Sequence, residues 1–303
     1  MQEKPALTHR LFTEMMQLFA DGTLYPLPYT RFDATHIVDA FRYMQQAKQI
    51  GKIVVAYDQP IKASHIKATS TEQSLELSHE ATYLVTGGLG GFGLKTAQWL
   101  VSKGAKHLAL LSRSGPVSEE AQAALAIFKA QGVTVLPAAC DVSDRKALAQ
   151  VLQQIDSELP PLKGVVHAAA VIEDSLALNL SDEQLERVLR PKITGARWLD
   201  ELTDHLDLDL FVLYSSATTL LGNPGQACYV AANHWLEALA ANRRARGKVA
   251  SCPRWGAIDD VGFLARNEKI KDALQSRIGG QALASDAALD ALEQMILNKI
   301  TNQ

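Results

Sequence analysis

Cysteine is scarce in this chain of 303 residues, and long apolar runs are missing. Cys140, Cys228 and Cys252 stand 88 and 24 residues apart, an odd number at spacings that suit neither a disulfide framework nor a zinc site. We therefore expect no bound metal and a cytoplasmic location, with Cys140 and Cys252 as buried apolar residues. No run of about 18 uncharged apolar residues could span a bilayer. Residues 1–10 contain no apolar core, so we expect no secretory signal.

Charge of one sign is not in excess either. Thirty Lys and Arg stand against 33 Asp and Glu, which leaves a formal net charge of −3. Such a balance creates no strong field, so we expect neither nucleic acid nor an anionic membrane as a partner. Apolar residues make up 47% of the chain, too many for a disordered protein. These values predict a globular chain of one or two domains.

The composition divides the chain into three parts. Residues 1–57 have the pattern of a compact segment, with a helical run at 35–49 and a short strand at 52–57. Residues 58–80 are rich in Ser, Thr, Lys and Glu with little periodicity, which is typical of a linker. Apolar strands then alternate with amphipathic helices, which predicts a domain over 81–303.

That domain is predicted to be an α/β fold with a doubly wound parallel sheet. Continuous apolar runs such as YLVT, LALLS and FVLYS indicate strands that are covered on both faces. Repeated strand–helix–strand units give right-handed crossovers onto one sheet. The pair Ser143-Asp144 is predicted to cap the third helix. The expected strands are 82–86, 107–112, 133–139, 164–169, 210–215 and 249–255, and the expected helices are 93–103, 119–131, 144–158, 182–204 and 227–246.

A glycine-rich turn, TGGLGGFG at 86–93, follows the first of these strands and opens a helix. This is the context in which a G-x-G-x-x-G pattern binds a dinucleotide. Glycines let the backbone approach a pyrophosphate, and the helix N-terminus supplies free N–H groups. A glycine turn without a ligand is the alternative, but so many glycines cost chain entropy, which favours binding. We expect the cofactor to contact Thr86, Gly88, Gly90, Gly91 and Gly93.

The end of the second strand, LSRSGP, indicates which dinucleotide is bound. A site for NAD usually has Asp or Glu here, whereas Arg accommodates the 2′-phosphate of NADPH. Arg113 holds this position beside Ser112, which favours NADPH, although Arg113 could also be a solvated surface residue. Asp141, directly after the third strand, suits the adenine amino group, although a strand-end Asp is also a common turn former.

Four further residues suit the reduction of a carbonyl group. Hydride transfer to a carbonyl needs a proton donor for the developing alkoxide and a hydrogen bond that polarises the carbonyl. Tyr229 can donate the proton if a nearby cation lowers its pKa from about 10. Ser216 can polarise the carbonyl, Asn233 shares a helix face with Tyr229, and Lys192 is the candidate cation. A core tyrosine and a solvated lysine are ordinary alternatives, but the set of four favours a reductase site.

These motifs resemble the ketoreductase domain of polyketide synthases, a branch of the short-chain dehydrogenase/reductase superfamily. The similar segments are TYLVTGGLGGFG, GVVHAAAVIEDS, FVLYSSATTLLGNPGQACYVAANHWLEALA and PRWG, within 81–292. Most of the superfamily has lysine four residues after the tyrosine and asparagine on the preceding helix. Polyketide and related fatty-acid ketoreductases have the two exchanged, as Lys192 and Asn233 are here. The resemblance implies a Rossmann-like fold.

The resemblance also implies a role for each residue. Tyr229 would be the proton donor, Ser216 would orient the ketone, Lys192 would tune the tyrosine and bind ribose, and Asn233 would hold a proton-relay water. Ala168, at the end of the HAA strand, would contact the cofactor. NADPH would supply the hydride. The substrate would be a β-ketoacyl chain tethered to an acyl carrier protein.

The stereochemical outcome is also implied by resemblance. Members that make the 3R (D) alcohol have a Leu-Asp-Asp segment after the HAA strand and a proline five residues before the tyrosine. This chain has Ile172-Glu173-Asp174 and Pro224 at these places. The opposite class has a tryptophan where this chain has Leu221. We predict the B-type, D-alcohol outcome, and an exposed loop carboxylate is the alternative for Asp174.

Residues 1–57 are similar to a different domain, the C-terminal tail of the medium-chain-reductase-type enoylreductase that precedes the ketoreductase in fully reducing synthases. The similarity lies in 22–57, which contains no glycine fingerprint, so we expect no nucleotide binding there. The other domains of the same synthase, including the enoylreductase, are the expected partners. The structural half-domain that usually completes such ketoreductases is not found in this sequence. A mobile lid over the substrate is expected at 259–280.

Two other functions remain open at this point. The first is a free-standing short-chain reductase that acts on a soluble ketone, which the enoylreductase-like segment disfavours. The second is a non-catalytic structural scaffold related to the reductases. The presence of the glycine turn and of all four chemical residues disfavours it.

Overall fold

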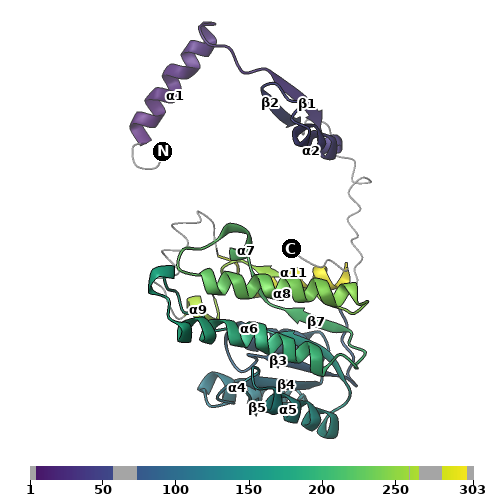
Figure 1. The fold of residues 1–303 in the computed structure, drawn as a ribbon. Coiled ribbons are helices and arrows are strands. Elements are labelled where there is room, and N and C mark those ends of the chain that lie inside the picture. The colour runs from purple at the N-terminus through teal and green to yellow at the C-terminus, as the bar shows by residue number, and fades with distance from the viewer. Residues whose placement is uncertain (1–4, 57–73, 259, 266–281, 299–303) are drawn as a thin grey trace. The chain divides into compact units, whose positions relative to one another are not determined.

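The computed structural model describes residues 5–56, 74–258, 260–265 and 282–298 (Figure 1). The chain divides into two compact units, Met1–Glu72 and Gln73–Gln303. Among the described residues, no helix combines the length and the apolar character that crossing a membrane requires.

The first unit contains a small parallel sheet. Its strands β1 and β2 pair from Tyr29 opposite Lys52 to Asp33 opposite Ala56. The sequence predicted a helix at 35–49 and a strand at 52–57, which correspond to α2 and β2, but it predicted neither α1 nor β1. Pro26 and Pro28 directly precede β1 and indicate a turn rather than a strand. The elements are α1 (Pro5–Ala20), β1 (Tyr29–Asp33), a 3₁₀ helix (Ala34–His36), α2 (Ile37–Gln45) and β2 (Lys52–Ala56).

Apolar side chains of the first unit are largely exposed. Ala40 is buried, whereas Tyr25 and Ile50 are each 82% exposed and Phe12 is 56% exposed. Two strands with α2 packed against them are too few to bury both faces of a sheet.

The second unit is built on a five-stranded parallel sheet in the order β5-β4-β3-β6-β7 (Figure 1). This is the predicted doubly wound α/β fold. From β3 the chain adds β4 and β5 on one side of the sheet, and it then returns to add β6 and β7 on the other side of β3. A crevice is expected where the order of the strands reverses, outside the carboxyl ends of β3 and β6. The strands are β3 (Thr82–Thr86), β4 (His107–Ser112), β5 (Thr134–Ala139), β6 (Leu162–His167) and β7 (Leu210–Leu213).

Helices cover both faces of this sheet. Tyr83 and Val85 of β3 pack with one layer of helices, and Leu84 packs with the other, as alternation along a strand requires. One layer consists of α3 (Gly91–Ser102), α4 (Glu119–Ala130) and α11 (Ser285–Leu297), and the other of α5 (Arg145–Glu158), α6 (Asp182–Leu202) and α8 (Ala227–Ala245). Cys140 and Cys252 are buried, as predicted.

Helix starts follow the local polar residues. Of the predicted capping pair, Asp144 is the residue that caps α5, and its carboxylate accepts from the backbone N–H groups of Lys146 and Ala147. Ser181 caps α6 in a reciprocal capping box with Gln184.

The strand predicted at 210–215 is interrupted. β7 ends at Leu213, and a two-residue strand, β8 (Ser215–Ser216), pairs with β9 (Arg254–Trp255). The break lies at Tyr214, whose carbonyl oxygen accepts a hydrogen bond from the side chain of Lys192 rather than from a neighbouring strand. The segment predicted as strand at 249–255 is correspondingly reduced to β9 and one isolated bridge between Ser251 and Val212.

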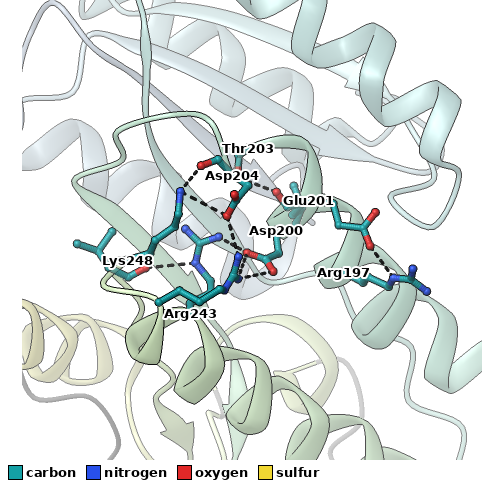
Figure 2. A network of polar contacts seen from close by, with 10 residues as sticks. Arg197, Asp200, Glu201, Thr203, Asp204, Arg243 and Lys248 are labelled. Carbon is teal, nitrogen blue, oxygen red and sulfur yellow. Dashed lines mark hydrogen bonds and ion pairs between the residues drawn. The ribbon is translucent and has the colours of Figure 1, made fainter.

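A network of ion pairs joins α6 to the end of α8 (Figure 2). Asp200 of α6 accepts hydrogen bonds from Arg243 and from Arg246, the latter at 2.7 and 2.9 Å. Arg246 also bonds Asp204 at 2.8 Å, and Lys248 donates to the carbonyl oxygen of Asp204. The Arg243 side chain is 1% exposed, so this ion pair is buried between α6 and the end of α8.

Much of the expected lid at 259–280 lies outside the described residues. Within the described part of that range, residues 260–265, a short helix α9 (Gly262–Ala265) is present. Asp260 accepts from the backbone N–H and the hydroxyl of Ser285 at 3.0 and 2.7 Å.

Candidate active site

The glycine turn forms a tight passage from β3 into α3. Gly87 has a φ of +73°, which a residue with a side chain rarely adopts. Gly90 is the N-cap of α3, so the helix begins at Gly91, two residues before its predicted start. A Cβ atom on Gly93 would lie 2.1 Å from the carbonyl oxygen of Gly87. Only glycine fits there, and the N-terminus of α3 is thereby held close to the end of β3.

Hydrogen bonds fix this turn against the second strand. The N–H of Gly88 donates to the carbonyl oxygen of Leu111 at 3.1 Å. The Ser112 hydroxyl donates to the carbonyl oxygen of Gly115 at 3.1 Å, and the Ser112 carbonyl accepts from Cys140 N–H. The predicted cofactor residues of β3, β4 and β5 therefore lie at one edge of the sheet, as a bound dinucleotide requires.

A buried histidine links the turn to the next strand. The Thr86 hydroxyl lies 2.7 Å from Nδ1 of His167, and Ala168 N–H donates to the carbonyl oxygen of Thr86. His167 is 1% exposed, and no described residue hydrogen bonds its Nε2. Burial and the nearby charge of Lys192 lower the pKa of His167 to about 3, so the ring is neutral. His167 was not among the predicted site residues, although a polar residue at the end of a buried strand was a signal for a role.

A cavity of about 200 Å³ opens beside Arg113. Its lining includes Asp141 and Ser143, which follow β5, and Arg190 of α6. Asp141 accepts from the N–H and hydroxyl of Ser143 at 2.9 and 2.7 Å. Burial opposes ionisation of Asp141, but these bonds and the charges of Arg190 and Arg113 outweigh it and lower its pKa. Arg190 was not among the predicted cofactor residues.

Lys192 is a buried cation. Its side chain follows Pro191 within α6 and is 2% exposed. Nζ donates to the carbonyl oxygen of Tyr214 at 2.7 Å and lies 5.4 Å from the centroid of the Tyr229 ring. Burial lowers the pKa of Lys192 to about 8. The structure therefore brings together the predicted cation and the predicted proton donor, which stand far apart in the sequence.

Tyr229 and Asn233 lie on the first turns of α8. The Asn233 amide donates to the carbonyl oxygen of Tyr229 at 2.8 Å. Asn233 is fully buried, and no described residue donates a hydrogen bond to its Oδ1. A buried polar atom without a protein partner is uncommon and marks a place where a water or ligand can bind.

The expectation that a cation lowers the pKa of Tyr229 is not met in this structure. Burial raises that pKa, while the side chains of Asn233 and Ser216 lower it in part, and the charge of Asp174 adds to the rise. The ammonium of Lys192 is hydrogen bonded to the carbonyl oxygen of Tyr214 and lies 5.4 Å from the centroid of the Tyr229 ring. The phenol is consequently protonated at neutral pH.

Ser216 occupies β8 and is 8% exposed. Its Oγ accepts hydrogen bonds from the N–H and the hydroxyl of Thr218, at 3.2 and 3.0 Å. Because these contacts use the oxygen as an acceptor, the hydroxyl hydrogen of Ser216 can be donated to a carbonyl oxygen.

The two residues predicted to control stereochemistry lie in segments that are bonded together. The exposed carboxylate of Asp174 accepts from the side-chain amide of Gln226 at 3.0 and 3.2 Å. Ser175 N–H donates to the carbonyl oxygen of Gly225, directly after the exposed Pro224. The Asp174 segment is thus attached to the turn that leads into α8.

Comparisons with known proteins agree with this geometry. The family model "KR domain" matches residues 81–260, and the family model "Zinc-binding dehydrogenase" matches residues 1–55. A reducing polyketide synthase of Cochliobolus heterostrophus is 38% identical over 278 residues, which are 91% of this chain and 11% of that protein. A highly reducing polyketide synthase of Fusarium mangiferae is 36% identical over 298 residues, which are 97% of this chain and 12% of that protein. The chain thus spans only about an eighth of the length of these relatives.

Solved structures give the same picture for the second unit. An A1-type ketoreductase is 40% identical with a TM-score of 0.70, and the match covers 78% of this chain and 48% of that one. The first ketoreductase of the tylosin polyketide synthase is 37% identical with a TM-score of 0.68, over 76% of this chain and 49% of that one. The chain therefore belongs to the KR family, the ketoreductase domains of polyketide synthases, whose members are NAD(P)H-dependent oxidoreductases.

Proposed function

We propose that the chain is a β-ketoacyl reductase, which transfers hydride from NADPH to the β-ketone of a thioester carried by an acyl carrier protein. The observation that carries this proposal is the arrangement of Lys192, Ser216, Tyr229 and Asn233. They come from α6, β8 and α8 and lie beyond the carboxyl ends of the sheet strands, where the glycine turn also lies. The product is a 3-hydroxyacyl thioester.

Each of the four residues has a distinct task in this reaction. Tyr229 gives its proton to the developing alkoxide, and Ser216 donates a hydrogen bond to the same oxygen. Lys192, whose Nζ lies 5.4 Å from the centroid of the Tyr229 ring, stabilises the phenolate that forms and would hold the ribose of the cofactor. Asn233 holds a relay water at its Oδ1, which has no donor among the described residues. When bound, the cofactor supplies the hydride.

The cofactor edge supports NADPH as the dinucleotide. A Cβ atom on Gly88 or Gly93 would clash with neighbouring backbone atoms, so the backbone there can approach a pyrophosphate. The cavity beside Asp141 is lined by Arg113, Arg187 and Arg190 together with Glu183 and Glu186, and Arg187 is bonded to Glu173. The guanidinium groups of Arg113 and Arg190 suit a 2′-phosphate better than a ribose hydroxyl. Arg113→Asp is expected to shift the preference, measured as the ratio of kcat/KM values, at least about tenfold toward NADH. An unchanged ratio would place the 2′-phosphate elsewhere.

The stereochemical proposal is the B-type, D-alcohol outcome. It is supported by Asp174 and Pro224, whose segments are bonded next to the entrance of α8, and by Leu221 in place of the tryptophan of the opposite class. Solved relatives of this chain include A-type ketoreductases at 40% identity. Overall identity does not decide this property, because a few side chains at the entrance determine which face of the ketone is presented.

For the organisation of the chain, we propose an enoylreductase-like tail at 1–57, a linker at 58–80 and a ketoreductase domain at 81–303. The two family matches support the first and third parts. Most of the proposed linker lies outside the described residues. Its last part, 74–80, belongs to the second compact unit, in which Leu77 N–H donates to the carbonyl oxygen of Lys103 at 2.8 Å.

One experiment tests the proposed function. The chain is incubated with a β-ketoacyl thioester on an acyl carrier protein, with NADPH and NADH in parallel, and the product alcohol is resolved by chiral chromatography. We expect reduction with NADPH to a D-alcohol, and a higher kcat/KM for the carrier thioester than for a simple soluble ketone. An L-alcohol would contradict the B-type assignment. A preference for the soluble ketone would favour a free-standing reductase, and a folded chain that binds no NADPH would favour a scaffold.

A further inference from the structure

A buried carboxylate lies two helical turns beyond the proposed proton donor. Glu237 is eight residues after Tyr229 and four after Asn233, so the three share one face of α8. Its side chain is 10% exposed. Oε1 accepts from the Ser215 hydroxyl and Oε2 accepts from Arg254, each at 2.7 Å. Glu237 therefore connects α8 to both strands of the small β8–β9 sheet.

These bonds converge on a short segment that also carries the reactive serine. Tyr214 accepts from Lys192, Ser215 donates to Glu237, and Ser216 is the proposed polarising hydroxyl. Tyr214, Ser215 and Ser216 are consecutive residues. Because peptide units are planar, only φ and ψ can rotate between them, so fixing the first two residues restricts the third. The Ser215–Glu237 bond thus sets where the Ser216 hydroxyl lies relative to α8, the helix that presents Tyr229.

The connection is strong because Glu237 is ionised. Burial opposes its ionisation, but hydrogen bonds from Arg254, Ser215 and Thr219 outweigh burial and lower its pKa. Hydrogen bonds to a carboxylate are shorter and stronger than those between neutral groups. An amide at this position would give Ser215 only a neutral, weaker acceptor and would leave the Arg254 guanidinium without its counter-charge, so both contacts of Glu237 are weakened in Glu237→Gln.

We propose that Glu237 is a positioning residue for the reduction. It holds the Ser216 hydroxyl at the place from which Ser216 and Tyr229 reach one carbonyl oxygen together. This inference rests on the proposed function, because it concerns the alignment of the same two groups. A displacement of about 1 Å in such an alignment can cost about a hundredfold in rate.

A double-mutant cycle tests the inference. Ser215→Ala and Glu237→Gln are made alone and together with Ser216→Ala, and kcat and KM are measured with NADPH and a β-ketoacyl thioester. Each single variant is expected to lower kcat about ten- to a hundredfold with KM changed less than about threefold. In the Ser216→Ala background each is expected to cost less than about twofold, because the group being positioned is already gone.

Asp200→Asn is the matched control. Asp200 is also a buried carboxylate bonded to arginine, and it lies eight residues beyond Lys192 on α6 as Glu237 lies beyond Tyr229 on α8. The control is expected to change kcat less than about threefold, by the same factor with and without Ser216→Ala. A merely structural role of Glu237 would give this same independent behaviour.

Two results would overturn the inference. One is full additivity of Glu237→Gln with Ser216→Ala, and the other is unchanged kcat in both Ser215→Ala and Glu237→Gln. Should Glu237→Gln not fold, Ser215→Ala carries the test, since it removes one hydroxyl. A wild-type chain without turnover contradicts the proposed function instead. Hydrogen exchange at the amides of 214–217, compared with the amides of β3 and β4, then tests the connection. Ser215→Ala must accelerate exchange at 214–217 more than in β3 and β4, whereas Asp200→Asn must change both sets alike, and an unchanged difference in Ser215→Ala overturns the inference.

Discussion

Buried charges are paired with opposite charges at one end of the α6–α8 helix pair, whereas the buried Lys192 at the other end has no ion pair among the described residues. At the end that Figure 2 shows, Asp200 and Asp204 meet Arg243, Arg246 and Lys248, and positive and negative groups neutralise one another. Arg243 is buried there with its guanidinium 3.7 Å from the centroid of the Phe211 ring. Every charge in this network has a partner, so this end contributes to holding the helices together.

At the other end, polar groups are buried without such compensation. Within the described part of the chain, Lys192 has a carbonyl partner but no ion pair, and Asn233 Oδ1 and His167 Nε2 have no hydrogen-bond partner. Leaving buried polar atoms unpaired costs stability. One end of a single helix pair is thus arranged for stability and the other for chemistry.

The largest effect on kcat is expected from Tyr229→Phe, at the end of the helix pair that contains Lys192 and Asn233. Without the phenolic proton, kcat for the ketone is expected to fall about 10³-fold, because a positioned acid contributes of that order. The ring is retained over Lys192, so the melting temperature and the Kd of NADPH, measured by nicotinamide fluorescence, are expected to stay close to those of the wild type. Near-normal turnover in this variant would show that the proton comes from another donor.

Asp200→Asn, in the ion-pair network of Figure 2, is expected to lower stability and to leave the reaction rate almost unchanged. It leaves the buried Arg243 without its carboxylate, and breaking one side of a buried pair costs about 3 kcal/mol. Urea unfolding measures that loss, while kcat of the folded variant is expected to stay within about threefold of the wild type. A large fall in kcat at unchanged stability would mean that the division between the two ends is not real.

Much of the fold and of the candidate site could be predicted, because short stretches of the sequence indicate them directly. Buried parallel strands read as unbroken apolar runs, so β3 and β4 were predicted with the bounds that the structure has, 82–86 and 107–112. The exchanged positions of Lys192 and Asn233 identified the type of reductase before any geometry was known.

What could not be predicted depends on contacts between distant segments. The strand predicted at 210–215 is interrupted at Tyr214, whose carbonyl oxygen accepts a hydrogen bond from Lys192, and no local pattern in the sequence indicates that bond between distant segments. Glu237 reads as an ordinary polar position of a helix until β8 and β9 are packed against it. The raised pKa of Tyr229 likewise follows from burial, which a list of neighbouring residue types does not give.

The last effect, a pH dependence of stability that leaves the reaction aside, concerns the charge on Lys192 itself. Burial holds the pKa of Lys192 near 8 in the folded chain, against an ordinary value of 10.5. Below pH 8 the lysine is charged in both states, and its burial destabilises the fold in full. Between about pH 8 and 10.5 the unfolded chain binds more protons than the folded chain. This lysine therefore makes stability rise with pH in that window, by at most about 1.4 kcal/mol per pH unit.

Lys192→Met removes this dependence. Urea titrations at a series of pH values measure the free energy of unfolding of both chains. The free energy of the variant minus that of the wild type is expected to be largest at pH 7 and to decrease steadily as the pH approaches 10.5. Other groups that titrate in the same range cancel in the comparison, because both chains contain them. A relative stability that stays constant across the window would show that the bond to Tyr214 fully offsets the burial of the ammonium, and the contrast between the two helix ends would then rest on Asn233 and His167 alone.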